Sequence, residues 1–401
     1  MIKVGVIFGG ESVEHEISII TAVQAMSFMD TKKYEVVPIY VAKDRNWYTG
    51  EALKDMASYK DLNNIPMLAK EVTLTKKGDS FILQKKNGLF KGTANTIDVA
   101  FPIVHGKGVE DGSLSGYLET IGIPYVGPSM LGASVGQDKV VQKQIMSASD
   151  VPVVDYTWFY DHEFKDDEEK ILKEIKKLGY PVIVKPARLG SSVGIEVAKN
   201  EKEVVEAIEE AIKYDEKIVI EAMVKNLMEV DCAVLGNSED MECSLIGEML
   251  TDNDFLTFED KYIGEKGKAG KKGGAKGNAN GKISTSGFKI PADLDKEIEE
   301  QIYEISKKAF RCLNLSGVTR FDFLVDKKAK KVYVNEPNTI PGCLAFFFYT
   351  PKGKKYPKLL DELITGAIKE YKDSKKKITS FDSNVLSTYD GSKGAKGKLQ
   401  P

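Results

Sequence analysis

The sequence predicts an α/β fold for the N-terminal part of the chain and an α+β fold for the rest. The first observation is a β-branched run, Lys3–Phe8, followed by Gly9-Gly10 and then by a helical pattern. This order of elements is how a doubly wound α/β unit begins. The second observation is that the apolar runs at 217–224, 228–236 and 241–250 have no helical pattern between them. Strands joined by short connections pair antiparallel, so this second sheet is expected to be antiparallel.

Length and composition limit the classes of protein to consider. The chain has 401 residues, of which 42% are hydrophobic and 29% charged, enough for about two to three domains with sizeable cores. A net charge of −3 gives no overall basic character for binding nucleic acid. The four cysteines have no C-x-x-C spacing, which fits a reducing cytoplasm better than a disulfide framework or a zinc site. No apolar run is long enough to span a membrane, and the first ten residues match a buried strand better than a signal peptide.

The helix after the first strand is expected to bury one face. Ile17, Ile20, Val23 and Met26 recur at near-helical spacing, which predicts a stripe that faces the core. Glu14 lies at the junction of loop and helix, where the strand ends of such sheets place ligands. A structural turn with solvated acidic side chains is the alternative.

Two of the three histidines also follow predicted strands. His15 lies next to Glu14, and His105 ends the buried run IDVAFPIVHG before the glycine- and acid-rich loop at 107–116. This position at a strand end suits a binding site. For either histidine, a structural role within the fold is the alternative.

A glycine-rich turn follows the predicted strand YPVIVKPA at 180–187. Lys185 lies near the end of this strand, and the segment 190–194, GSSVG, comes shortly after. The backbone N–H groups and hydroxyls of such a turn can approach an anion closely. The lysine precedes the glycines, so the pattern is not a Walker loop. A plain β-turn is the alternative.

The densest group of polar side chains lies in GVTRFDFLVDKKAKKVYVNEPNTIPG, residues 317–342, which predicts two apolar strands joined by a charged turn. Since side chains alternate along a strand, Arg320 and Asp322 share one face, and Glu336 and Asn338 share one face of the second strand. Two carboxylates and an amide oxygen suit Mg²⁺, which is held in proteins together with substrate phosphates. A surface hairpin with ordinary charges is the alternative.

The remaining segments carry simpler predictions. Pro337 lacks a backbone donor, so this position is expected at a sheet edge or at the end of the strand pairing. Residues 290–314 predict a helix that buries Ile298, Ile302, Ile305 and Ala309, and residues 356–372 predict the last helix.

Lys, Gly, Ala and Asn dominate the segment 264–281, which has too few apolar residues to fold alone. It is either a flexible linker or a lid that orders over a polyanionic nucleotide, and its basic character favours the lid.

Seven short motifs occur in an order that is typical of one enzyme family. They are FGGESVEHEIS, HG-x-x-x-EDG, DK-x-x-x-K, VKPARLGSSVGI, FEDKY, RFDF and NEPNTIPG. With them, nearly the whole chain resembles the D-alanine–D-alanine ligases of the ATP-grasp superfamily. The resemblance implies an N-terminal α/β domain followed by a two-part ATP-grasp fold. The implied parts are 1–126 for the N-terminal domain, 127–223 for the central subdomain, 224–375 with a lid loop at 263–286 for the C-terminal subdomain, and 376–401 for a flexible tail.

The implied activity is ATP-dependent ligation of two D-alanines through an acyl phosphate, giving D-alanyl-D-alanine for peptidoglycan synthesis. The implied ligands are ATP, D-alanine and two Mg²⁺ ions, for which Mn²⁺ could substitute. The resemblance further implies a cytoplasmic homodimer without nucleic-acid or membrane partners. A ligase of the same fold with another acceptor (D-serine, another D-amino acid or D-lactate) and a non-catalytic nucleotide-binding regulator are the alternatives.

The resemblance also implies a role for each matching residue. Lys139 and Lys185 would hold the ATP phosphates, with Ser191 and Ser192 in the glycine-rich flap, and Lys261 would reach the transferred phosphate from the lid. The adenine would lie against Glu221, Met223 and Val224, and the ribose would contact Glu229. The metal ions would bind Asp322, Glu336 and Asn338. The first D-alanine would contact His105 and Glu14, the latter held by Ser191 and Tyr262. The oxyanion would be stabilised by Arg320 and the N–H of Gly342.

Several positions depart from the family pattern. Val109 stands where glycine is usual, and Ser115 where glutamine is usual. Phe347 or Phe348 stands where a serine commonly holds the second substrate's carboxylate, so the acceptor is open, with Thr350 as another source of a hydroxyl. The tyrosine of FEDKY is the residue that dipeptide-forming members carry, and it favours an amino-acid acceptor over a hydroxy acid.

Overall fold

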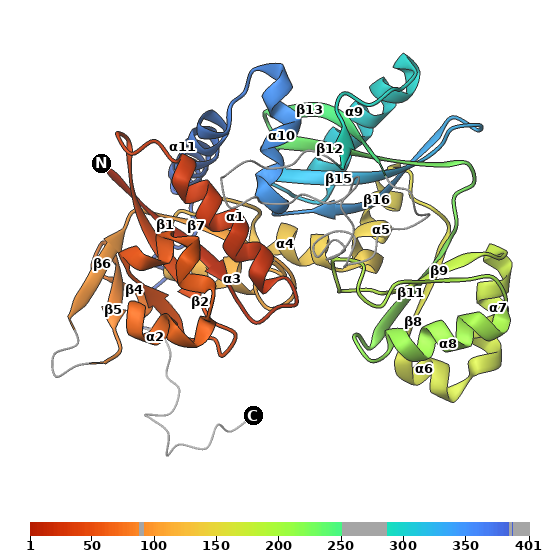
Figure 1. Ribbon diagram of the computed structural model, residues 1–401, viewed down its shortest axis with the longest axis horizontal. Helices are drawn as coiled ribbons and strands as arrows, with labels where there is room; N and C mark the ends of the chain where they lie inside the picture. Colours follow the sequence, from red (N-terminus) through yellow and green to blue (C-terminus); the bar gives the residue numbers. More distant parts are fainter. Residues whose placement is uncertain (88–91, 251–286, 385–386, 388–401) are drawn as a thin grey trace.

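Three β-sheets organise the molecule (Figure 1). The computed structural model describes residues 1–87, 92–250, 287–384 and 387. The strand orders are β6-β5-β4-β3-β2-β1-β7, then β10-β9-β11-β8, then β14-β13-β12-β15-β16. In Figure 1 the first sheet lies on the left, the second at the lower right and the third above them. The predicted combination of an α/β part with antiparallel sheets is confirmed.

The first sheet is parallel only around its central strand. β1 (Ile2–Gly9) pairs in parallel with β2 (Tyr34–Val41) and β7 (Val99–Val104). An antiparallel extension follows from β2, made of β3 (Trp47–Thr49), β4 (Lys70–Lys77), β5 (Ser80–Lys85) and β6 (Thr93–Ile97). The sequence pattern did not predict this extension. The helices of this part are α1 (His15–Phe28), α2 (Ile65–Leu68) and α3 (Ser113–Ile121).

The predicted core-facing stripe of α1 is wrong in part. The helix buries His15, Ser18, Ile19, Ala22 and Ala25 among others, whereas Ile20 is 40% exposed. Small and polar residues can face the sheet because β1 and β7 approach the helix closely, and Ser18 donates a hydrogen bond to the carbonyl of Ile103 at 2.6 Å. The larger side chain of Ile20 turns instead toward the cavity described below.

The second sheet is antiparallel and small. It contains β8 (Tyr156–Tyr160), β9 (Val182–Pro186), β10 (Glu196–Ala198) and β11 (Lys217–Ala222). The helices α6 (Asp161–Asp166), α7 (Glu168–Leu178) and α8 (Glu201–Ala211) supply its core. The Asp167 side chain accepts the backbone N–H of Lys170 at 3.1 Å and caps the start of α7.

The third sheet carries the predicted polar hairpin. Its strands are β12 (Leu227–Gly236), β13 (Met241–Met249), β14 (Phe288–Lys289), β15 (Gly317–Asp326) and β16 (Lys331–Asn338). β16 is an edge strand, as Pro337 predicted. The amphipathic helix α9 (Lys296–Cys312) covers the sheet through Ile298 and Ile302, also as predicted. The other helices near this sheet are α4 (Met130–Gln137), α5 (Lys139–Ala148) and α10 (Phe346–Tyr349).

A β-bulge interrupts the pairing of β15 with β16. Asp322 pairs with Glu336 and Phe323 with Val334, so Asn335 has no partner in this ladder. A bulge of this kind changes the direction of nearby side chains. It lets the neighbouring residues Asn335 and Glu336 both take part in the polar network of the site.

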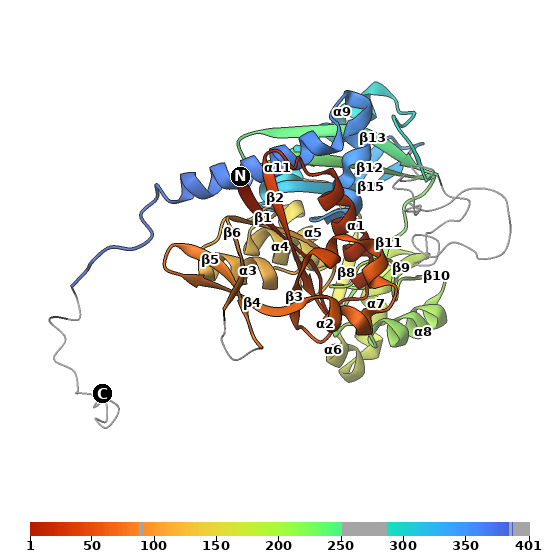
Figure 2. The ribbon, with the colours of Figure 1, turned by 60° about the vertical axis from the view of Figure 1, so that its left-hand side comes forward.

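The last helix, α11 (Tyr356–Ser374), packs against the N-terminal sheet rather than the third sheet alone (Figure 2). Leu360, Leu363 and Ile364 belong to the same buried cluster as the residues of β1 and β7. Tyr371 donates its hydroxyl to the carbonyl of Gly122 at 2.9 Å, and Tyr34 donates to the Asp361 carboxylate at 2.6 Å. The first and last parts of the chain therefore share one core.

Part of the predicted organisation lies outside the described residues. The proposed lid at 264–281 falls within the undescribed residues 251–286. Of the predicted tail, residues 376–384 and 387 are described and exposed. None of the helices described here has the length and apolar character needed to cross a membrane.

Candidate active site

A cavity of about 230 Å³ lies where the three sheets meet. Segments far apart in the sequence line it: the first half of α1 and the residue before it, the loop after β7, the start of α5, the glycine-rich turn after β9, the middle of β15, and the ends of β13 and β16. The predicted site residues in the lining are Glu14, His105, Lys139, Ser191, Arg320, Asp322, Glu336, Asn338 and Gly342. The structure thus brings together most of the predicted residues that it describes.

Arg320 is held between two carboxylates. Its Nε lies 2.7 Å from Asp322 Oδ1 and 3.2 Å from Asp231 Oδ2, and its Nη2 donates to Asp322 Oδ2 at 2.9 Å. Asn338 also donates to Asp322 Oδ2, at 3.1 Å. The register of the sheet explains this cluster, since Asp231 and Asp322 are paired across β12 and β15. Sequence reasoning missed Asp231, although it lies only two residues after the predicted Glu229.

Lys139 neutralises the charge of Glu336, another of the predicted metal ligands. Its Nζ lies 2.9 Å from Glu336 Oε2 and donates to the carbonyl of Leu189 at 2.8 Å. Burial favours the neutral amine, but the carboxylates around it, Glu336 foremost, outweigh this effect and raise the pKa of Lys139. A cation is therefore already bound at each of the two carboxylates, Asp322 and Glu336.

The donor set fits Mg²⁺. Asp322, Glu336 and Asn338 offer hard oxygen atoms at the wall of the cavity, on paired strands. No group of three His, Cys, Asp or Glu side chains arranged for a metal occurs in the described residues. Two carboxylates and one amide would therefore need oxygen atoms from a phosphate or from water to complete the shell, which is usual for Mg²⁺.

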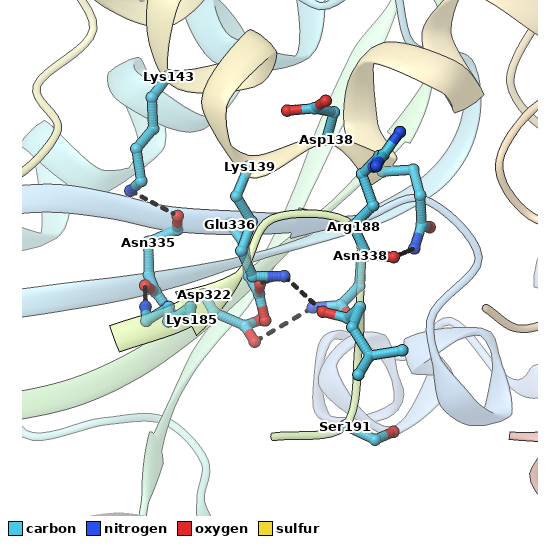
Figure 3. A network of polar contacts seen from close by, with 12 residues as sticks. Asp138, Lys139, Lys143, Lys185, Arg188, Ser191, Asp322, Asn335, Glu336 and Asn338 are labelled. Atoms are coloured by element: carbon cyan, nitrogen blue, oxygen red, sulfur yellow. Dashed lines mark hydrogen bonds and ion pairs between the residues drawn. The ribbon is translucent and has the colours of Figure 1, made fainter. Parts of the chain in front are cut away.

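A second polar network lies deeper, beside these residues (Figure 3). The Glu221 carboxylate lies between two lysines, 3.1 Å from Lys143 Nζ and 2.8 Å from Lys185 Nζ. Both lysines also donate to the bulge residue Asn335: Lys143 to its backbone carbonyl at 3.2 Å and Lys185 to its Oδ1 at 3.1 Å. Burial favours the neutral acid, but the two lysines outweigh it and lower the pKa of Glu221 to about 2. Burial lowers the pKa of Lys143, against the opposite effect of Glu221.

The glycine-rich turn approaches Glu14 closely. Ser191 donates a hydrogen bond to Glu14 Oε1. A Cβ at Gly190 would lie 2.9 Å from Glu14 Oε2, so a side chain at position 190 would displace this carboxylate. Ser191 and Ser192 have φ angles of 56° and 58°, a left-handed conformation that is uncommon for residues other than glycine. Ser192 does not line the cavity.

Glu110 is a cavity residue that sequence reasoning missed. Its Oε1 accepts hydrogen bonds from the Thr339 hydroxyl at 3.0 Å and the Ile340 N–H at 3.1 Å, and its Oε2 accepts from the Gly106 N–H at 2.8 Å. It thus joins the loop after β7 to the loop after β16. Burial, with a smaller effect from Glu14, raises the pKa of Glu110 to about 7. The carboxylate was visible in the EDG motif, but its partners were not.

His105 lies next to this junction. It is buried, and its Nε2 has no hydrogen-bond partner among the described residues. Burial lowers the pKa of His105 to about 4. A neutral imidazole therefore faces the cavity, while His15 is used within the fold, bonded to the Gly10 carbonyl at 2.6 Å and to the Tyr40 hydroxyl at 2.9 Å.

The backbone is unusual just before Phe347 and Phe348, where the family commonly has a serine. Cys343, Leu344 and Ala345 have φ angles of 53°, 51° and 51°, and this left-handed run brings Phe347 to the cavity wall. The expected substitute Thr350 is exposed and donates its hydroxyl to the carbonyl of Phe346 at 3.1 Å. Thr350 does not line the cavity.

The hydroxyl in this part of the wall belongs to Thr21 of α1, which accepts the N–H of Cys343 at 3.3 Å.

The other predicted residues do not line the cavity. Met223 and Val224 lie between β11 and β12, and Glu229 lies on β12. Lys261 and Tyr262 lie outside the described residues. The proposed adenine and ribose contacts thus stay predictions.

Two family models match most of the sequence. A model described as "D-ala D-ala ligase N-terminus" matches residues 3–128, and one described as "D-ala D-ala ligase C-terminus" matches residues 145–365. The chain belongs to the D-alanine–D-alanine ligase family. The family predicted from the seven motifs is therefore confirmed.

Full-length relatives carry the same name. The D-alanine–D-alanine ligase of Thermosipho melanesiensis is 39% identical over 387 residues, which cover 96% of this chain and 98% of that protein. That of Clostridium acetobutylicum is 38% identical over 370 residues, covering 90% and 96%. The predicted activity agrees with these names.

Solved ligases share the fold. The D-alanine–D-alanine ligase of Coxiella burnetii has a TM-score of 0.76 at 28% identity, covering 94% of this chain and 96% of its own. The VanG D-Ala:D-Ser ligase of Enterococcus faecalis has a TM-score of 0.73, also at 28% identity, covering 91% and 99%. A Bacillus anthracis D-alanine–D-alanine ligase complexed with ATP has a TM-score of 0.61 at 24% identity, covering 93% and 99%.

Proposed function

We propose that this ligase joins two D-alanines at the expense of ATP. The first D-alanine carboxylate attacks the terminal phosphate of ATP, giving an acyl phosphate and ADP. The amine of the second D-alanine then attacks the acyl carbon, and phosphate leaves with formation of the peptide bond. The observation that carries the proposal is the meeting of Arg320, Asp322, Glu336 and Asn338 with Glu14 and Ser191 in one cavity.

The first substrate would be oriented by the N-terminal side of the cavity. Glu14, fixed by Ser191, offers a carboxylate to the substrate ammonium group. The neutral His105 lies beside it and adds no charge. This leaves the substrate carboxylate directed toward the cationic side of the cavity, where Lys139 and Arg320 lie.

The phosphate-transfer step needs neutralisation of charge more than covalent chemistry from the protein. Lys139 and Lys185 would hold the phosphate oxygens, with the glycine-rich turn over them. Two Mg²⁺ ions, when bound at Asp322, Glu336 and Asn338, would supply further charge neutralisation. Mn²⁺ has similar ligand preferences and could replace them.

The acyl-transfer step passes through a tetrahedral oxyanion. Arg320 and the Gly342 N–H lie in the cavity wall and are suitable donors. The two carboxylates on Arg320 hold its guanidinium in place before the substrate arrives. Donors fixed in advance do not have to reorganise during the reaction, which is how such sites lower barriers.

A ligase with D-serine as the acceptor is the second candidate. Phe347, one of the two residues that fall where the family commonly has serine, lines the cavity, and the VanG relative shows that this fold accommodates a D-Ala:D-Ser ligase. We favour D-alanine because Phe288 packs against Phe347, and Ile17 and Ile20 line the same cavity. Thr21 offers a D-serine hydroxyl a partner in this part of the wall, but it already accepts the N–H of Cys343.

One assay tests the function. Purified protein with ATP, Mg²⁺ and D-alanine should release phosphate and give the mass of D-alanyl-D-alanine, and D-serine and D-lactate should give less product in competition. Phosphate release that does not depend on D-alanine would contradict the proposal. Absence of turnover with retained ATP binding would instead support the non-catalytic regulator.

We also propose three features of organisation. The parts 1–126, 127–223 and 224–375 act as the three domains, in line with the three sheets. The protein works as a homodimer in the cytoplasm, where four unpaired cysteines remain reduced. Light scattering at micromolar concentration tests the dimer.

A further inference from the structure

One buried carboxylate in this protein is shared by two lysines. Glu221 is 1% exposed, and each of its oxygens faces a different ammonium group, Oε1 that of Lys143 and Oε2 that of Lys185. One cation would be enough to neutralise the carboxylate. The second lysine therefore needs another explanation.

The two lysines differ in their surroundings. The side chain of Lys143, on α5, is 0% exposed and is also fixed to the backbone carbonyl of Asn335. Lys185 is the penultimate residue of β9, shortly before the glycine-rich turn, and it also contacts the Asn335 side chain. Asn335 directly precedes Glu336, the proposed metal ligand. Lys143 is thus part of the closed interior, whereas Lys185 lies close in sequence to the glycine-rich turn proposed to cover the phosphates.

We infer that Lys143 is the permanent counter-ion of Glu221 and thereby allows Lys185 to leave this carboxylate for a nucleotide phosphate. The inference rests on the proposed function, in which Lys185 holds ATP. A buried carboxylate that loses its only cation is strongly destabilised. With Lys143 in place, Glu221 keeps one cation when Lys185 moves, and the phosphate gains one. Lys143 is then a positioning residue, which acts on the nucleotide only through Glu221 and Lys185.

The decisive variant is Lys143→Met, which keeps the apolar stem and removes the charge. Glu221 then depends on Lys185 alone, so Lys185 stays with it and ATP binds less tightly. We expect the dissociation constant of ATP, measured by calorimetry, to rise by at least ~10-fold, because the lost cation leaves a buried charge to be compensated. The KM for D-alanine should change much less.

A second substitution should cancel the effect of the first. In the double variant Lys143→Met/Glu221→Gln, the carboxylate that retains Lys185 is gone, so ATP should bind as tightly as it does to the single variant Glu221→Gln, which carries any loss of the proposed adenine contact. Lys354→Met is the matched control. Lys354 is also a buried lysine between two carboxylates, Glu242 and Glu362, but it does not line the cavity. The variant Lys354→Met should have a lower melting temperature than the wild type and unchanged ATP binding.

The outcomes are distinct. Unchanged ATP affinity in Lys143→Met, or weaker ATP binding by the folded double variant than by Glu221→Gln, overturns the inference and makes Lys143 purely structural. If Lys143→Met does not fold, a crystal structure of the wild type with a non-hydrolysable ATP analogue decides: Lys185 should contact phosphate and Lys143 should still contact Glu221. Lys185 remaining on Glu221 in that complex overturns the inference. A wild type that binds no ATP would instead refute the proposed function.

Discussion

Ser191 donates a hydrogen bond to Glu14, a residue 177 positions earlier in the chain. The bond joins the glycine-rich turn of the second sheet to the start of α1 in the N-terminal part. It helps to orient the Glu14 carboxylate at the cavity wall. The turn that would cover the ATP phosphates therefore also orients the residue proposed for the first amino acid.

Replacing this hydroxyl should weaken binding of the first D-alanine. In Ser191→Ala, Glu14 loses a charge-assisted hydrogen bond, a type worth about 1.5–3 kcal/mol. The KM of the first D-alanine, from steady-state phosphate release, should rise ~10-fold or more. Ser27→Ala, which removes an exposed hydroxyl bonded only within α1, serves as the control. An unchanged KM would show that Ser191 does not position Glu14.

Glu336 should be indispensable for turnover. Glu336→Gln removes a carboxylate oxygen donor for Mg²⁺ and the ion pair with Lys139. We expect phosphate release to fall to background while the circular dichroism spectrum stays unchanged. Asp326→Asn, on the same hairpin but outside the cavity, should behave as the wild type. Near-normal turnover of Glu336→Gln would refute the metal assignment.

Arg320 should contribute to the rate and to the fold separately. Arg320→Met removes an oxyanion donor, which typically costs about 2.7–4 kcal/mol of transition-state stabilisation, or a ~10²–10³-fold loss of kcat. It also leaves the buried Asp231 without this partner, so the free energy of unfolding should fall. Adding Asp231→Asn should restore stability to urea but not kcat. Recovery of both would make Arg320 a structural residue only.

Glu110 and His105 should give opposite pH dependences of stability. The pKa of Glu110 is raised from 4.5 to about 7, so its contribution to stability is present below 4.5 and lost as the pH rises through 7. The pKa of His105 is lowered from 6.5 to about 4, so its contribution is present above 6.5 and lost as the pH falls through 4. Between pH 4.5 and 6.5, the two residues therefore change the free energy of unfolding of the wild type in opposite directions.

Each single variant should expose the other residue's effect. Relative to the wild type, the free energy of unfolding of Glu110→Gln should rise more steeply as the pH rises from 4.5 to 6.5. Relative to the wild type, that of His105→Asn should fall over the same range. Urea unfolding at several pH values measures both slopes. Parallel slopes in all three proteins would contradict the assignments.

The acceptor should be an amino acid rather than a hydroxy acid. A free amine must attack the acyl phosphate, so dipeptide formation should rise toward alkaline pH. In equimolar competition at neutral pH, D-alanine should be used in preference to D-lactate. The variant Tyr262→Phe tests the sequence-based expectation for the tyrosine of FEDKY and should lose part of this preference. A depsipeptide as the main product from the wild type would show that the expectation from Tyr262 is wrong.

Local patterns in the sequence were sufficient to predict the hairpin that carries Arg320, Asp322, Glu336 and Asn338. Alternation along two strands fixes which side chains share a face, and this is a property of the chain itself. The α9 face was predictable for the same reason. The α1 face was not, because close packing against β1 and β7 selected small residues there over the apolar stripe.

Contacts that depend on long-range pairing could not be predicted. Asn335 joins the network only because the ladder of β15 and β16 slips by one residue at this point. Lys143 and Glu221 lie on different elements, and no pattern in either segment predicts their contact. Glu110 stood in a recognised motif, yet its role as a bridge depends on Thr339 and Ile340, more than two hundred residues further along.

The packing of α11 against the first sheet bears on how the chain is made. β1 is synthesised before α11, but the core that contains β1 includes Leu360, Leu363 and Ile364. Until these residues leave the ribosome, one side of the N-terminal sheet stays without its cover, and apolar surface left open in this way is prone to association. A truncated chain that ends at residue 126 would keep that surface permanently. The core around β1 is therefore completed only after α11 has been made.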